Sequence, residues 1–162
     1  MANEAYIGRG TQKVANTDFT WTVAGLGNGA GRVSAQIDLG AAPRPAWYEW
    51  VCEVQFQATP TQYKTLDLFI AVAQDDTNTR MDADLGTSDA ALGDVDMRHN
   101  LKQIGAVVSE NAAASEKCIA SGRFICTARY LSLIAYNDSG ASVNATGGNF
   151  VFKLTPIYWQ GQ

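Results

Sequence analysis

The sequence has little of what enzymes use for catalysis. Its 162 residues include one histidine, His99, and three cysteines. A catalytic histidine works with a nucleophile and an orienting acid, and no serine or cysteine stands in a nucleophile-elbow context. Cys52, Cys118 and Cys126 follow no metal-binding or redox spacing, so we expect reduced thiols. These absences predict a protein without a catalytic, cofactor or metal site, which works through its surfaces.

Positive charge is also scarce. Twelve Lys and Arg stand against 16 Asp and Glu, which gives a net charge of −4. Nucleic-acid binding relies on clustered Lys and Arg, so this balance argues against nucleic acid as a partner, and equally against an anionic membrane surface. No apolar run approaches the roughly 20 residues that span a bilayer. The first residues lack the basic and apolar stretches of a secretory signal, so we expect synthesis in a cytoplasm.

Helical periodicity is missing as well, and alternation of apolar and polar residues dominates from about residue 17. It is clearest over residues 46–58, where Trp50 and Cys52 share one face while Trp47 and Glu49 share the other. This period of two is typical of a half-buried strand. Further strands are predicted over residues 18–24, 32–39, 65–73, 101–109, 116–126 (as one or two strands), 129–137 and 149–159 (interrupted near Pro156).

About eight strands separated by turn residues predict an all-β protein. We expect an antiparallel β sandwich, and the strand number with the long connections favours a jelly roll over an immunoglobulin-like sandwich. Residues 17–162 are predicted to form this single domain, and residues 1–16 an N-terminal arm or edge segment. The order of the strands within the sheets stays open.

One long segment without strand signals, residues 74–100, is acidic. A loop of this length is usually functional or partly helical, and Ser88 could cap a short helix over residues 89–92. Calcium binding stays open, although the spacing fits no EF-hand loop. We expect the segment to contact a neighbouring subunit. It contains seven of the 16 acidic residues: Asp75, Asp76, Asp82, Asp84, Asp89, Asp94 and Asp96.

Two sequence features that suggest enzymes or nucleotide binding do not hold up. The glycines at positions 25, 27, 29 and 31 precede a strand pattern rather than a helix, and no Lys-Ser or Lys-Thr follows them, which favours a hairpin loop over a phosphate site. Glu49 and Glu53 lie on one strand about 13 Å apart. That separation exceeds the window of about 5–9.5 Å for the paired acids of a glycosidase.

The tryptophans are the strongest candidates for surface contacts. Trp50 belongs to the inward set of its strand and is expected in the core, whereas Trp47 shares the wet face with Glu49. Trp159 lies near the C-terminus, where an exposed aromatic residue often anchors an interface. Trp47 and Trp159 could stack on a sugar or contact another subunit, and we favour subunit contact.

Five segments together resemble a family of small virion proteins of tailed bacteriophages. They cover residues 82–94, 100–108, 120–124, 128–141 (Ala-Arg-Tyr-Leu-Ser-Leu-Ile-Ala-Tyr-Asn-Asp-Ser-Gly-Ala) and 150–157. The resemblance implies a jelly-roll capsid decoration, or cement, protein located on the capsid surface after synthesis in the bacterial host. It further implies a non-enzymatic role, namely to bind and stabilise the capsid exterior. The implied partners are the major capsid protein and further copies of the chain, which would form a homotrimer.

In such a protein the arm would reach a neighbouring molecule. We therefore take as candidate interaction residues four in the arm, together with the two tryptophans. The alternative is a carbohydrate-binding adhesion module associated with the tail or a fibre, acting through exposed aromatic residues. The candidate interaction residues are Tyr6, Ile7, Arg9, Lys13, Trp47 and Trp159.

Overall fold

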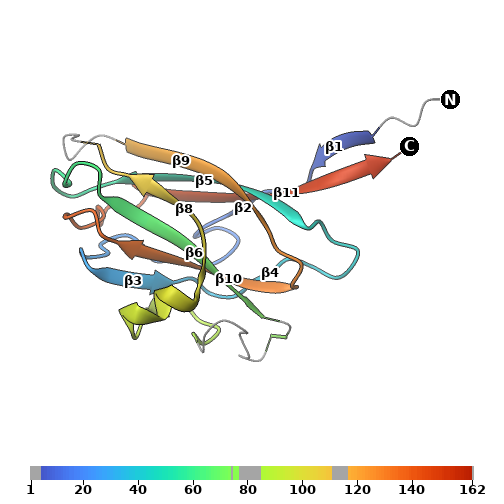
Figure 1. The fold of residues 1–162 in the computed structure, drawn as a ribbon, viewed down its shortest axis with the longest axis horizontal. Coiled ribbons are helices and arrows are strands. Elements are labelled where there is room, and N and C mark those ends of the chain that lie inside the picture. Colours follow the sequence, from blue (N-terminus) through green and yellow to red (C-terminus); the bar gives the residue numbers. More distant parts are fainter. Residues whose placement is uncertain (1–4, 74, 77–84, 111–116, 162) are drawn as a thin grey trace.

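The computed structural model describes residues 5–73, 75–76, 85–110 and 117–161, and it is an all-β structure of two antiparallel sheets packed as a sandwich (Figure 1). The first sheet contains β1 (Ala5–Arg9), β2 (Lys13–Val14), β5 (Trp47–Gln55), β9 (Lys117–Ile125) and β11 (Phe150–Gly161). The second sheet contains β3 (Ala30–Val33), β4 (Ile37–Asp38), β6 (Thr65–Ala73), β7 (Ala90–Ala91), β8 (Lys102–Val108) and β10 (Tyr130–Asn137).

The strand order is that of a jelly roll. The first sheet has the order β1-β11-β5-β9, with β2 also on β11, and the second has β7-β3-β10-β6-β8, with β4 also on β10. If β1/β2 and β3/β4 each count as one strand and the short β7 is left aside, the two sheets read 1-8-3-6 and 2-7-4-5 in chain order. This interleaving of two Greek keys defines the jelly roll. The predicted fold class is therefore confirmed, and the strand order left open by the sequence is resolved.

The strand predicted over residues 18–24 is wrong as secondary structure. Its alternation does describe burial, because Phe19, Trp21 and Val23 are buried while the residues between them are exposed. The segment enters the core without joining a sheet: the Trp21 ring lies edge-on to Phe150, with centroids 5.3 Å apart, and its backbone N–H donates to the Asn16 side chain. Periodicity therefore reported which side chains are inside and not a backbone ladder.

β11 runs without interruption through Pro156, contrary to expectation. The carbonyl of Pro156 accepts from the Gly10 N–H at 2.9 Å, so this side of the residue faces the gap between β1 and β2. In an antiparallel strand the nitrogen and oxygen of one residue point to the same side. The missing proline N–H therefore faces that gap and takes no hydrogen bond from the ladder with β5. β9 likewise forms one strand through Ser121 and Gly122.

The core lies between the two sheets and contains large side chains from both. The three cysteines are buried there as free thiols, and burial raises the pKa of the Cys52 thiol. Trp50 fills the space beneath β8 and β9, where two glycines leave room for its ring. A Cβ atom built on Gly122 would lie 2.8 Å from the Trp50 ring, and one on Gly105 would lie closer still. The Trp50 indole can occupy its place because both positions lack a side chain.

We predict that Gly122→Ala destabilises the protein by about 1–3 kcal/mol, because the added methyl group collides with Trp50 in a filled core. Gly147→Ala is the matched control, since nothing lies within 4 Å of a Cβ at that position. Urea unfolding of both variants measures the difference. Equal midpoints for Gly122→Ala and the control would contradict this account of the core.

The described part of the acidic segment covers the outer face of the second sheet. Its 3-10 helix η1 (Val95–Asn100) begins after Asp94, whose carboxylate accepts from the Asp96 N–H at 2.9 Å. The predicted cap at Ser88 is wrong, because Ala90 and Ala91 form β7 against β3 instead of a helix. Asp82 and Asp84 lie outside the described residues. Side chains of this segment that pack on the second sheet are Leu85, Leu92 and Met97, joined by Leu101 directly after it.

A partly buried ion pair fastens this cover to the sheet. Arg32 on β3 donates from Nε and Nη2 to the two carboxylate oxygens of Asp89, at 2.8 and 2.7 Å, and the Thr22 N–H donates to the same carboxylate. Burial alone would raise the pKa of Asp89. The hydrogen bonds from Arg32 and Thr22 outweigh it and hold that pKa below its ordinary value.

We predict that Asp89→Asn destabilises the protein at neutral pH by about 1–3 kcal/mol, because the Arg32 guanidinium loses its charged partner. Since the folded-state pKa of Asp89 is lowered, its contribution is fully present above about pH 4 and disappears as the pH falls through the folded-state pKa. Thermal unfolding of wild type and variant between pH 7 and pH 2 tests this. A gap between their Tm values that stays constant down to pH 2 would rule it out.

Candidate binding groove

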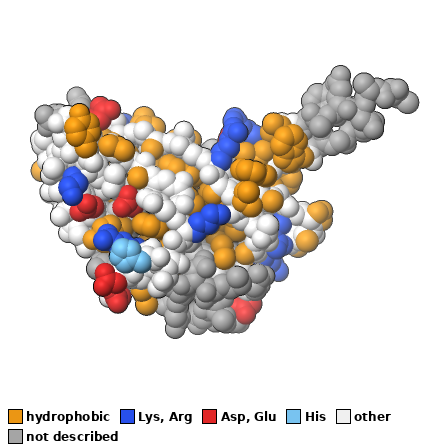
Figure 2. Space-filling view, in the orientation of Figure 1, with side chains coloured by type: hydrophobic (Ala, Val, Ile, Leu, Met, Phe, Trp, Pro, Cys, Tyr) orange, Lys and Arg blue, Asp and Glu red, His pale blue; other side chains and the backbone are white. Residues whose placement is uncertain are grey.

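The outer face of the first sheet, unlike that of the second, has no cover within the described part of the chain. Strand alternation directs Trp47, Glu49 and Val51 outward from β5, and the strands paired with it carry outward residues in register. Nine large hydrophobic residues are exposed in the described part of the chain, and six of them project from the outer face of the first sheet. They are Ile7, Trp47, Val51, Ile119, Ile125 and Trp159. Figure 2 shows hydrophobic side chains gathered with Lys and Arg where β1 and the end of β11 leave the sandwich in Figure 1.

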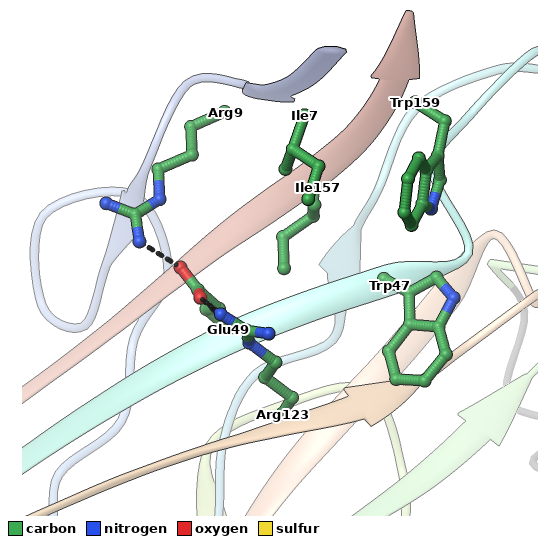
Figure 3. A pocket seen from close by; sticks show the side chains of 7 residues that line it. All are labelled: Ile7, Arg9, Trp47, Glu49, Arg123, Ile157 and Trp159. Carbon is green, nitrogen blue, oxygen red and sulfur yellow. Dashed lines mark hydrogen bonds and ion pairs between the residues drawn. The ribbon is translucent and has the colours of Figure 1, made fainter. Parts of the chain in front are cut away.

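A groove of about 180 Å³ lies on this face where β1, β11, β5 and β9 come together. Figure 3 shows both indole rings at one end of the groove and a charged group at the other, with two isoleucines between them. Trp47 is 40% and Trp159 67% exposed. The lining residues are Ile7, Arg9, Trp47, Glu49, Arg123, Ile157 and Trp159.

The charged end consists of one carboxylate between two guanidinium groups. Arg9 Nη2 lies 2.8 Å from Glu49 Oε2, and Arg123 donates from Nε (2.9 Å) and Nη2 (2.5 Å) to Oε1. The side chains of Arg9 and Arg123 are 68% and 63% exposed, whereas that of Glu49 is only 19% exposed. The group therefore carries a net charge of +1 on a chain whose net charge is −4. Each guanidinium has five N–H donors, so most of them stay available to a partner.

The chemical groups that the groove offers are indole rings, guanidinium groups and one carboxylate. Its lining contains one carboxylate, held by two arginines, and no hydroxyl, thiol or imidazole. Tyr48 lies behind Glu49 in the core, where burial raises the pKa of its hydroxyl to about 12, so it holds its proton at neutral pH. Indole rings and guanidinium donors supply stacking and directed hydrogen bonds, which are the means of recognition.

Four of the six candidate interaction residues come together in this groove: Ile7, Arg9, Trp47 and Trp159. Tyr6 is placed in β1 opposite Gln160, but its side chain lies outside what the structure describes. Lys13 lies on β2 opposite Leu154 and does not line the groove. Sequence reasoning missed Arg123 and Ile157, because only the pairing of β5 with β9 and β11 brings them beside Glu49 and Trp47. The sequence signal that pointed to this site was the alternation that places Trp47 and Glu49 on the same solvent-exposed face of their strand.

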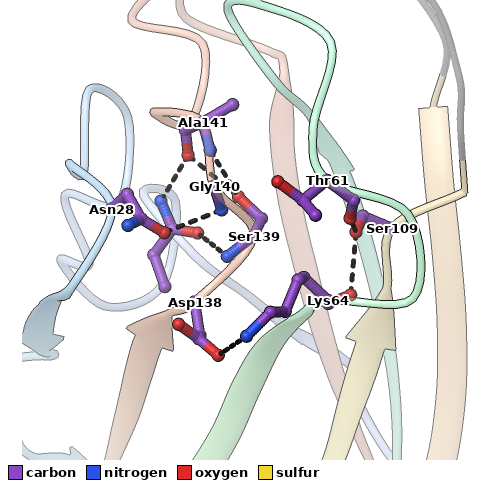
Figure 4. A network of polar contacts seen from close by, with 9 residues as sticks. Asn28, Thr61, Lys64, Ser109, Asp138, Ser139, Gly140 and Ala141 are labelled. Atoms are coloured by element: carbon purple, nitrogen blue, oxygen red, sulfur yellow. Dashed lines mark hydrogen bonds and ion pairs between the residues drawn. The ribbon is translucent and has the colours of Figure 1, made fainter.

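A second polar cluster lies at the opposite end of the sandwich and serves the fold (Figure 4). The buried Asn137 amide donates to the carbonyls of Leu26 and Ala141, and its oxygen accepts from the Ser139 N–H. Nearby, the Gly140 N–H donates to the Asn28 side chain at 2.7 Å. These bonds join the loops that follow different strands, and every amide group of Asn137 is used within the chain.

Among the described residues, no helix is long and apolar enough to cross a membrane. The same residues contain no group of three or more His, Cys, Asp or Glu side chains that could hold a metal ion.

Comparisons with known proteins give a likeness of overall shape. No protein-family model and no curated protein matches the sequence. Among solved structures, murine APRIL is 8% identical with a TM-score of 0.42, over 94% of this chain and 99% of that one. The sugar-binding C-terminal domain of EclA is 15% identical (TM-score 0.33; 99% and 79% covered). The CBM22-1–GH10 modules of Clostridium thermocellum xylanase 10B are 14% identical (TM-score 0.38; 90% and 26% covered).

We predict that Glu49→Gln changes the free energy of unfolding by less than about 1 kcal/mol, because the ion pairs it breaks involve exposed arginine side chains. Chemical unfolding checks this against Asp89→Asn, the partly buried ion pair of the second sheet. A loss at Glu49 as large as the loss at Asp89 would mean that the charged group supports the fold rather than the surface.

Proposed function

We propose that the protein is a non-enzymatic component of a bacteriophage virion that binds and stabilises the capsid exterior as a homotrimer. The major capsid protein is the partner, and the outer face of the first sheet is the docking surface. The observation that carries the proposal is the unequal cover of the two sheets. The chain covers the second sheet with its own acidic segment, whereas nothing in the described part of the chain packs over six exposed large hydrophobic residues of the first sheet.

The size of this face suits a protein whose work is binding. Four strands about 4.8 Å apart and about 30 Å long give a footprint of about 600 Å². Stable interfaces bury about 800 Å² on each partner, so this face supplies most of one such contact. A protein that binds the assembled shell and not its separated parts shifts the assembly equilibrium towards the shell. Added buried area is then the whole of the function, and the rigid jelly roll holds the face in shape.

The resemblance to virion proteins of tailed phages supports the choice of partner. It rests on residues of the C-terminal half, including the β10 segment 128–141. β10 is central in the second sheet and buried along its whole length. These residues therefore support the fold and the family resemblance, but they say little about the docking surface. The docking surface is inferred from exposure and packing instead.

The location test is immunogold labelling of purified virions of the phage that encodes the chain. We predict label spread over the head.

The binding test is co-sedimentation of the purified protein with shells that lack it. It compares wild type with two variants: Ile125→Asp places a charge on the outer face of the first sheet, and Val108→Asp changes a similarly exposed position on the second sheet. Binding should weaken at least tenfold for Ile125→Asp only. Intact virions without label on the head would contradict the proposal.

A second candidate function is favoured by the groove itself. Two exposed tryptophans at one end of the groove offer an apolar platform, and Arg9, Glu49 and Arg123 at the other end offer hydrogen-bonding groups. Aromatic stacking together with hydrogen bonds is the usual way to bind a sugar ring. In this case the chain is a carbohydrate-binding adhesion module associated with the tail or a fibre. Label at the tail, with glycan-array binding that Trp47→Ala abolishes, would favour this function over decoration. Head label without glycan binding would exclude it.

A further inference from the structure

One end of the first sheet consists of two strands without a third. The pairing of β5 with β11 ends at Trp47 opposite Ile157, whereas β1 follows β11 further, to Ala5 opposite Gly161. Residues 5–8 and 158–161 therefore form a two-stranded extension, here called the terminal ribbon, which projects from the sandwich (Figure 1). Two-stranded ribbons are at best marginally stable in water. Contact with another molecule would therefore stabilise the terminal ribbon.

The composition of the terminal ribbon is that of an interface core. Its sequence, Ala-Tyr-Ile-Gly paired with Tyr-Trp-Gln-Gly, contains no charged residue. Ile7 and Trp159 lie directly opposite each other across the two strands and are 63% and 67% exposed. Interface cores are depleted in charge and enriched in aromatic residues. Covering this ribbon would remove two large apolar side chains from water without desolvating a charged group.

The same chain also carries a surface that its own ribbon cannot reach. Val51 and Ile119 are exposed on the outer face, on the far side of the Glu49–Arg123 ion pair from the groove. Val51 is four residues along β5 from Trp47, about 13 Å away. Val51 and Ile119 are diagonal neighbours on adjacent strands and are called the receiving pair. Every copy of the protein therefore has one projecting apolar ribbon and one uncovered apolar pair.

We infer that the terminal ribbon of one copy lies across the receiving pair of a second copy, which leaves the part of the outer face around Trp47 and Ile125 for the capsid. This deepens the proposed function, on which it rests only for the expectation that the chain assembles with itself. The two surfaces occur in equal numbers when the partner is another copy, so each ribbon finds a receiving pair. When each copy gives its ribbon to one neighbour and receives the ribbon of another, the contact is head to tail, and such contacts form a ring when the rotation between copies closes; the proposed homotrimer is one such ring.

The charges on the outer face favour this head-to-tail contact over a face-to-face one. Lys153 is exposed in the row of Val51, and Lys117 pairs with Glu53 beside Ile119. With Arg9 and Arg123 the face carries four positive and two negative side chains. Two such faces placed against each other would repel. The uncharged ribbon can cross the face of another copy without adding a like charge to it.

Sedimentation velocity of the full chain over a concentration series tests the contact. We expect wild type to form a closed oligomer, and Trp159→Ser and Ile119→Ser each to raise the dissociation constant at least tenfold. Val108→Ser, a matched change of an exposed apolar residue on the second sheet, should leave it unchanged. Because all three positions are at least half exposed, far-ultraviolet circular dichroism should show the same fold in each variant. A wild type that stays monomeric at all concentrations would overturn the inference.

Cysteine cross-linking identifies which surfaces meet. Ile7→Cys and Ile119→Cys are prepared as separate proteins, oxidised alone and then as a mixture; the native cysteines are buried and stay reduced. We expect a disulfide-linked dimer only in the mixture. No dimer in the mixture, or equal dimer from Ile7→Cys alone, would overturn the head-to-tail contact. Oligomers that do not bind shells would contradict capsid binding and leave this inference standing. Monomers that bind shells would contradict this inference and the homotrimer, and would leave capsid binding standing.

Discussion

A sandwich of two sheets buries one face of each sheet against the other, and the two outer faces must be polar, covered or held by a partner. This constraint organises the molecule. The second sheet meets it internally: residues 85–101 pack Leu92 and Leu101 onto it, and the Arg32–Asp89 ion pair fastens them. The first sheet meets it with charged residues in some rows and leaves apolar residues exposed in others.

The same constraint explains the shape of the groove. Glu49 on β5 and Arg123 on β9 form a charged row, and Arg9 on β1, one row away, reaches the Glu49 carboxylate across β11. These charged groups keep this part of the face hydrated. On one side of the row lie the tryptophans and the terminal ribbon, and on the other lie Val51 and Ile119. The charged row thus divides one apolar face into two patches, which is why a single chain can present both halves of a contact.

Much of the fold could be predicted from the sequence, because alternation along β5 and β6 records which side chains face the core, and the mostly apolar sequence of β10 records burial on both faces. The prediction failed where alternating buried side chains belong to a segment whose backbone does not pair with a sheet. Phe19, Trp21 and Val23 alternate like a strand but belong to a loop that enters the core. Pro156 looked like an interruption, yet its missing N–H faces the gap between β1 and β2.

The site was predictable only in part, for a related physical reason. Trp47 and Glu49 could be assigned to a wet face because they lie on one strand. Arg123 and Ile157 could not, since their places beside these residues depend on the register of strands distant in sequence. That the acidic segment contacts a neighbouring subunit stays a prediction; sequence alone could not show that the ion pair between Asp89 and Arg32 also ties its described part to its own sheet.

The most direct test of the central claim, that the uncovered face of the first sheet is held by a partner molecule, is amide hydrogen exchange of residues 5–9 and 157–161 over a dilution series. The account predicts fast exchange in dilute protein and protection that grows with concentration, while β10 stays protected throughout. Fast exchange of the terminal ribbon at every concentration, and equally in protein bound to capsids, would contradict it.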